Sequence, residues 1–330
     1  MDKIRVGMIG CDLHALYYAV LMAEHDPLVL RGDGMGQDRG QAAFFYHYTH
    51  YNDPRTMTAP QVWEFQIVKC WDPDPESAEA VARVFGARVC DHFADCSEDV
   101  DLVFIPDCNG DGSTHLGLAT PGLTKGVPTF VDKPLAYEYR DALAILDLGA
   151  AHGAPVMSLS MLRTVPQARW FRDRLQEVSP VGYGSIKGGG AAMAGQIHAI
   201  SLAQHVFGWG VAAVEAMGPG ELSYVHLDYG GRADRPSHGV MLNCDAGPTW
   251  HCSFYVSAFG AQGVIHSGNI GDFEFPEGAG EILRRIVRMV RAGQPTEPRA
   301  EMLENIAVAT AARIAQREGR RVYLKEVTGG

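Results

Sequence analysis

Short apolar runs alternate with helical patterns through the first half of the chain. The apolar runs lie at 4–9, 65–71, 87–90, 100–106, 127–131 and 155–159, and the helical patterns at 13–23, 76–85, 115–125 and 139–152. Strands that alternate with helices are typical of a parallel, doubly wound sheet. We therefore predict that the chain begins with an α/β domain of this kind.

The pattern changes after about residue 160. Between 211 and 275, strand-like runs are separated by glycine-rich turn signals at 218–220, 230–231 and 247–248, and helical patterns follow at 280–292 and 299–318. This order predicts an α+β domain with an open, mostly antiparallel sheet. A length of 330 residues suits two domains, and we place them at 1–135 and 136–330.

Residues 24–63 interrupt the first domain and contain an aromatic, histidine-rich run at 44–51. Insertions of this length in a compact domain are usually functional or disordered, and so many aromatic residues argue against disorder. His47 and His50 are three residues apart, so with Asp53 they offer metal ligands if the segment is helical. We favour an aromatic surface or interface patch instead, and expect no metal site.

Composition and charge exclude several classes of protein. The formal net charge is −11 and no long basic run occurs, which argues against nucleic-acid binding. The sequence contains no uninterrupted apolar stretch of about 18 residues, the length that a membrane span requires. The first residues run directly into a strand pattern, unlike a signal peptide. The seven cysteines are scattered without a C-x-x-C motif, so we expect reduced thiols and a cytoplasmic protein.

The ends of two predicted strands carry candidate chemistry. Lys133 and Pro134 follow the run at 127–131, and Asp72 follows the run at 65–71. Open α/β sheets bind ligands at the carboxyl ends of their strands. A carboxylate after the second strand can accept hydrogen bonds from ribose hydroxyls and repels a 2′-phosphate, which favours NAD over NADP. The alternative is that both places are plain turns.

The first turn is a poor match to a phosphate-binding glycine loop. Gly10 is present, but Asp12 occupies the place of the second glycine in G-x-G-x-x-G. A side chain and a negative charge at that place disfavour close approach of a pyrophosphate. His14, at the start of the predicted helix, is in a position to point at a ligand.

Four stretches together resemble the Gfo/Idh/MocA family, named after glucose-fructose oxidoreductase and inositol dehydrogenase. They are Val6-Gly-Met-Ile-Gly10, the run 101–106 followed by Thr114-His115, Asp132-Lys133-Pro134, and the stretch 196–208, which contains His198. The resemblance implies a Rossmann domain, a second domain with an open sheet, and a homo-oligomer, dimer or tetramer, built through that sheet. It also implies NAD(P)-dependent hydride transfer at a secondary alcohol of a small-molecule substrate, often a sugar or polyol.

The same resemblance assigns roles to individual residues. Lys133 would hydrogen-bond the reacting oxygen and His198 would be the catalytic histidine, since a neutral imidazole suits removal of a hydroxyl proton. The family often places Asp four residues before and three residues after that histidine, where this chain has Ala194 and Ser201. The residues that we assign to cofactor binding are Gly10, Asp12, His14, Asp72, Asp107, His115, Asp132 and Pro134. We assign Arg163 and Ser201 to substrate binding.

Three functions stay open at this level. The favoured one is an NAD-dependent oxidoreductase acting on a sugar-like or polyol hydroxyl. The second is a family member without redox turnover that binds a small molecule or a protein, with 24–63 as a lid or interface. The third retains bound NAD and carries out chemistry without net redox change. Asp12, Ala194 and Ser201 motivate the second.

Overall fold

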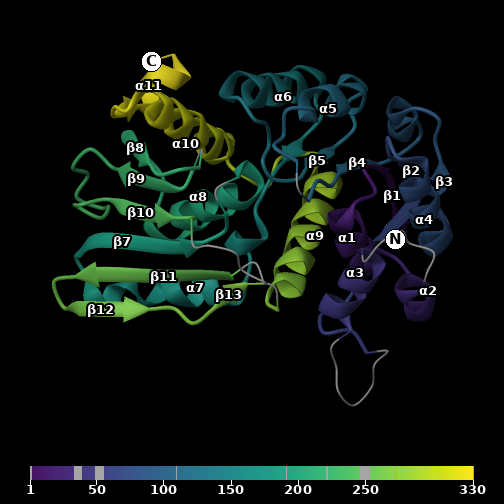
Figure 1. Cartoon of the computed structure of the whole chain (residues 1–330). Helices are drawn as coiled ribbons and strands as arrows, with labels where there is room; N and C mark the ends of the chain where they lie inside the picture. The colour runs from purple at the N-terminus through teal and green to yellow at the C-terminus, as the bar shows by residue number, and fades with distance from the viewer. Residues whose placement is uncertain are drawn as a thin grey trace.

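The computed structural model describes residues 2–32, 39–48, 56–108, 110–190, 192–220, 222–245, 253–271 and 273–329. Two β-sheets lie side by side, and the long helix α9 (Phe275–Ala292) stands between them (Figure 1). None of the described helices is both long and apolar enough to cross a membrane.

The first sheet is parallel and has the strand order β3-β2-β1-β4-β5-β6. Its strands are β1 (Ile4–Ile9), β2 (Phe65–Trp71), β3 (Arg88–Val89), β4 (Leu102–Ile105), β5 (Thr129–Val131) and β6 (Val156–Met157). All six match predicted apolar runs, which confirms the doubly wound sheet. β6 pairs with β5 although it lies beyond residue 135, and the division of the chain at that residue stays a prediction.

Helices and 3₁₀ turns connect these strands. They are α1 (Leu13–Met22), α2 (Pro27–Arg31), α3 (Arg39–His47), α4 (Pro75–Phe85), η1 (Phe93–Ser97), α5 (His115–Thr124) and α6 (Tyr139–His152). Local sequence sets their ends. For example, Asp74 caps the start of α4, and Gly86, in the left-handed conformation, ends it.

Within the segment 24–63, α3 packs against α1 and α2 packs against α3. The ring of His47 lies 4.4 Å from that of Tyr17, and burial lowers the pKa of His47 to about 3. A neutral histidine buried among aromatic rings serves the packing of α3 on α1, and the surface or interface patch that we favour stays a prediction. His50 and Asp53, the other members of the metal hypothesis, lie outside the described residues.

The second sheet has the order β12-β11-β7-β10-β9-β8-β14, with β13 paired to β11, and of the described pairs in this sheet only β7–β10 is parallel. This confirms the mostly antiparallel prediction. The strands are β7 (Val181–Gly188), β8 (Ala213–Met217), β9 (Tyr224–Asp228), β10 (Val240–Asn243), β11 (Ser253–Gly260), β12 (Gly263–His266), β13 (Ile270–Gly271) and β14 (Val322–Tyr323). The accompanying helices are η2 (Met161–Arg163), α7 (Pro166–Asp173), η3 (Arg174–Val178), α8 (Met193–Phe207), α9, α10 (Arg299–Glu318) and α11 (Leu324–Thr328).

The helix predicted at 280–292 begins earlier, at Phe275. Pro276 is tolerated there because the first helical residues have no intrahelical N–H partner to lose. Gly278 and Gly280 weaken the helical pattern in the sequence, yet both are buried against neighbouring elements. This earlier start carries α9 up to the site described below.

Arg313 of α10 fastens the second domain to the chain that follows Pro134. Its guanidinium is 7% exposed, donates a 2.6 Å hydrogen bond to the carbonyl of Tyr137 and stacks 3.8 Å from the centre of the Tyr137 ring. A cation buried in this way is stabilised by the ring face and the carbonyl together. Removing it leaves both partners unsatisfied.

We therefore expect Arg313→Ala to lower the free energy of unfolding by about 2–4 kcal/mol, since it empties a packed, hydrogen-bonded site. Urea denaturation followed by circular dichroism measures this change. Arg317→Ala is the matched control, because Arg317 lies on the same helix with a side chain 68% exposed. Equal stability of the two variants would contradict the fastening role.

Candidate functional site

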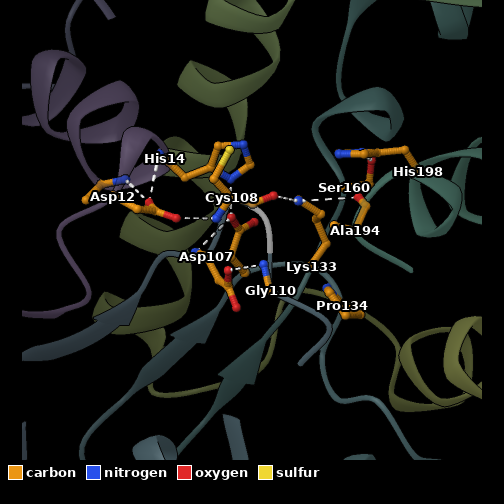
Figure 2. Close-up of polar contacts among 12 residues, drawn as sticks. Asp12, His14, Asp107, Cys108, Gly110, Lys133, Pro134, Ser160, Ala194 and His198 are labelled. Carbon is orange, nitrogen blue, oxygen red and sulfur yellow. Dashed lines mark hydrogen bonds and ion pairs between the residues drawn. The ribbon is translucent and has the colours of Figure 1, made fainter. Parts of the chain in front are cut away.

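The candidate site lies where the parallel strands end, on the side that faces α8 of the second domain (Figure 2). Gly10 follows β1, Asp72 follows β2, Asp107 comes shortly after β4, and Asp132 and Lys133 follow β5. Because these strands are parallel, their carboxyl ends meet at one edge of the sheet. The topology thus brings together side chains from distant parts of the sequence.

Gly10 and Asp72 shape the first turn. Gly10 has φ of +105°, and a Cβ atom there would lie 2.9 Å from the carbonyl oxygen of Pro106, so the position requires glycine. The Asp72 carboxylate accepts a 2.6 Å hydrogen bond from the backbone N–H of Cys11. Asp72 is therefore tied to the glycine turn, and its contact with a ribose stays a prediction.

Asp12 fills the place beside this turn with its own carboxylate. One carboxylate oxygen accepts hydrogen bonds from the N–H groups of His14 (2.8 Å) and Ala15 (3.1 Å), and the other accepts one from the N–H of Cys108. Free N–H groups at a helix start are the ones that bind phosphate in other Rossmann folds. In α1, two of these N–H groups already donate hydrogen bonds to the Asp12 carboxylate.

Arg39, which sequence reasoning missed, brings a positive charge to the same turn. Its guanidinium donates a 3.2 Å hydrogen bond to the carbonyl of Cys11 and lies 3.8 Å from the Asp74 carboxylate. Arg39 is the first residue of α3, so the segment 24–63 supplies a cation next to the acidic groups of the turn.

His14 and Asp132 form a buried ion pair. Nδ1 of His14 contacts the Asp132 carboxylate, and Asp132 is 1% exposed. Burial by itself would lower the pKa of His14, but the negative charge of Asp132 outweighs it and raises that pKa to about 10. His14 is therefore an imidazolium at neutral pH.

Lys133 reaches across the gap between the two domains. Its side chain is buried, and Nζ donates hydrogen bonds to the carbonyls of Cys108 (2.8 Å) and Ala194 (3.5 Å). The first carbonyl belongs to the loop after β4 and the second to the first turn of α8. One ammonium thus links three segments of the chain.

A second set of contacts holds the loops on both sides of Lys133, and it is made by His115, Asp107 and Pro134. Nδ1 of His115 donates a 2.8 Å hydrogen bond to the carbonyl of Pro134, and Nε2 lies 3.0 Å from the Asp107 carboxylate. Burial would raise the pKa of Asp107, but the contact with His115 lowers it below its ordinary value. These three residues hold the loops on both sides of Lys133.

His198 faces Lys133 from α8 and pairs with a serine instead of an acid. Its Nδ1 lies 2.7 Å from Oγ of Ser160, and its ring packs against Phe254 and Phe275. Burial, then the charges of Lys133 and His14, hold the pKa of His198 well below its ordinary value. A neutral imidazole beside an ammonium can accept a proton while the ammonium stabilises a negative oxygen.

Arg163 and Ser201 lie behind this pair, in the wall of a small cavity that Lys133 and Ser160 also line. The Arg163 guanidinium donates a 2.8 Å hydrogen bond to Gln204 and pairs with the Glu301 carboxylate. Ser201 is buried in α8. Ser160 was missed from sequence, although it follows β6 and thus obeys the same rule about strand ends that selected Lys133.

Comparison with known proteins agrees with this architecture. Residues 4–159 match the model of an oxidoreductase family with an NAD-binding Rossmann fold. Inositol 2-dehydrogenase 3 of Saccharopolyspora erythraea is 33% identical over 100 residues, which are 30% of this chain and 29% of that protein. The match thus spans less than a third of that relative's length.

Solved structures share the whole two-domain fold. GenD2 from gentamicin A biosynthesis, crystallised with NAD, has a TM-score of 0.73 at 16% identity, covering 98% of this chain and 97% of its own. Myo-inositol 2-dehydrogenase from Lactobacillus plantarum has a TM-score of 0.69 at 13% identity, covering 98% and 99%. Residues 4–159 thus match an oxidoreductase family with an NAD-binding Rossmann fold, and the chain as a whole shares the fold of these solved structures.

Proposed function

We propose that this protein is an NAD-dependent oxidoreductase that transfers a hydride at a secondary alcohol of a sugar-like or polyol substrate. The observation that carries the proposal is that His198, held by its contact with Ser160, lies near the buried ammonium of Lys133 at the strand ends of a Rossmann domain (Figure 2). Relatives that are inositol dehydrogenases support a polyol substrate.

The residues at the strand ends fit NAD. Gly10, in a backbone conformation that glycine favours, keeps the first turn tight, as a dinucleotide site requires. Asp72 would hold the adenosine ribose and favours NAD over NADP, while Gly10, His14 and Arg39 surround the place of the pyrophosphate. Asp107, His115, Asp132 and Pro134 would form the wall on the nicotinamide side. When bound, NAD supplies the hydride acceptor.

The protein's own side chains would handle the proton and the developing charge. If Nδ1–H of His198 donates to Ser160, Nε2 is free to take the hydroxyl proton of the substrate. Lys133 would stabilise the resulting negative oxygen, because an ammonium held in place needs no reorganisation during the reaction. We assign Arg163 and Ser201 to positioning of the substrate from behind this pair.

The outer face of the second sheet suits an oligomer contact. The side chains of β11 alternate between buried and exposed, and large apolar residues are exposed on several strands: Met217, Tyr255, Phe259, Val264 and Tyr323. Exposed apolar patches of this kind mark protein interfaces. We propose that this face joins copies of the chain into a homo-oligomer.

The first test replaces the lysine. Lys133→Ala removes the ammonium that would stabilise the substrate oxygen, so we expect kcat/KM for a polyol substrate to fall by about 10³-fold. Steady-state assays of NADH formation across a polyol panel measure this. Lys325→Ala, at an exposed lysine remote from the site, is the control. Wild-type activity in Lys133→Ala would refute the assignment.

A second test concerns Asp12. Asp12→Gly frees the N–H groups of His14 and Ala15 and removes a negative charge, so we expect NAD⁺ to bind about tenfold more tightly or better. Calorimetric titration measures the affinity, and Asp12→Asn separates the loss of charge from the loss of the cap. Weaker binding in Asp12→Gly would mean that the carboxylate holds the loop ready for the cofactor. No binding in either protein would favour the redox-inactive alternative.

A third test concerns Ser160, a positioning residue for His198. Ser160→Ala removes the hydroxyl that orients the imidazole, so we expect kcat to fall by about 10–100-fold while KM for NAD⁺ stays unchanged. The lowered pKa of His198 predicts that wild-type kcat/KM stays level on acidification until the pH is below about 6.5. In Ser160→Ala this acid limb moves to lower pH, because the imidazolium loses an acceptor.

Ser160→Thr retains a hydroxyl and should recover most of the activity. If Ser160→Ala lowers kcat without moving the acid limb, and threonine does not rescue it, the serine is merely structural.

A further inference from the structure

A second hollow in the molecule is lined by arginines. It measures about 490 Å³ and lies between α7, the end of α8 and the first half of α9, with Ala59 and Pro60 of the first domain on one side. Pockets of this size hold small organic ligands and often occur between domains. Lys133, Ser160 and His198 are not part of its wall, whereas Arg163 lines both this hollow and the small cavity beside Lys133.

Five arginines and two glutamates face this hollow. The arginines are Arg163, Arg169, Arg172, Arg284 and Arg285, and the glutamates are Glu277 and Glu281. The Glu281 carboxylate accepts hydrogen bonds from three guanidiniums, those of Arg284, Arg285 and Arg288, each at 3.2 Å. Arg163 pairs with the Glu301 carboxylate, and Arg285 has a second carboxylate partner in Glu297.

Positive charge is left over on α7. Arg169 makes no ion pair with any residue that the structure describes, and the partner of Arg172 is its exposed neighbour Asp173, at 3.6 Å. Arg169 and Arg172 are three residues apart, so they project from the same face of the helix. That face borders the hollow, opposite the arginines of α9.

His205, in the last turn of α8, turns an unpaired nitrogen into the same wall. Its Nε2 is buried without a hydrogen-bond partner in the described part of the chain. Burial, then the charges of Arg172, Arg163 and Arg285, lower the pKa of His205 to about 3. The charges of these three arginines therefore all act on the His205 ring. The neutral ring retains one N–H that can donate a hydrogen bond to a ligand.

We propose that this hollow is a binding site for a small phosphate-bearing anion, separate from the candidate catalytic site. Guanidinium groups match phosphate oxygens with paired hydrogen bonds, which makes clustered arginines the usual phosphate ligands. Arg169 and Arg172 contact the phosphate from α7, Arg284 faces it from α9, and His205 lies at the base. The volume leaves room for an organic body beside the phosphate.

The test is calorimetric titration of the full chain at constant ionic strength, with inorganic phosphate and with glycerol 2-phosphate as probes. We expect saturable binding of one phosphate per chain, and an affinity about tenfold lower or worse in Arg169→Ala/Arg172→Ala. The matched control is Arg140→Ala/Arg317→Ala, which removes the same charge from side chains that are 85% and 68% exposed elsewhere. Its phosphate affinity should equal that of the wild type.

Tighter binding of the ester than of free phosphate supports an organic phosphate as the ligand, and equal binding supports the phosphate group alone. Absence of saturable heat with both probes, or equal losses in the two double variants, would overturn the proposal. NAD⁺ titrations of the same variants keep the two sites apart, because the α7 variant should retain wild-type NAD⁺ affinity whatever becomes of the proposed enzyme activity.

Discussion

The site depends on one buried ammonium. Lys133 is 3% exposed, and among the described residues its hydrogen-bond partners are backbone carbonyls. An isolated charge inside a protein is costly, so the surrounding loops must present their oxygens to it. That requirement fixes the loop after β4 and the first turn of α8 relative to β5. The two domains therefore meet in one arrangement around Lys133.

The charges next to Lys133 explain why His198 is neutral. His14 is a cation held by Asp132, and its charge and that of Lys133 both disfavour a third positive group nearby. An acid beside His198 would reverse this by stabilising the imidazolium. Ser160 offers a hydrogen bond without a charge, so the imidazole keeps a lone pair available. The absence of acids at Ala194 and Ser201 thus fits a base rather than a defective site.

Sequence patterns located the six strands of the first sheet and most helices between them because each has a clear hydrophobic period or a marked end. In the second sheet, β7 and β14 lie outside the predicted strand-like runs. Phe65–Trp71 and Tyr139–His152 were predicted to the residue. Contacts between distant segments were harder to predict. Ser160 meets His198 only after β6 and α8 are brought together, and Arg39 meets Cys11 only after α3 packs on α1. The early start of α9 was not predicted because a proline and two glycines interrupt the helical pattern. The proline is tolerated at the helix start, and burial offsets the cost of the glycines.

Asp12 and Arg39 belong to one adaptation of the first turn. An aspartate in place of the second glycine caps α1 and bonds the loop after β4, which makes the turn stable without a ligand. The same carboxylate opposes a pyrophosphate, and the cation needed to offset it comes from the segment 24–63 through Arg39. In a standard glycine loop the helix N–H groups wait for phosphate. Here a side chain satisfies them, and any bound dinucleotide must draw its affinity from displacing Asp12 or from the charges of Arg39 and His14.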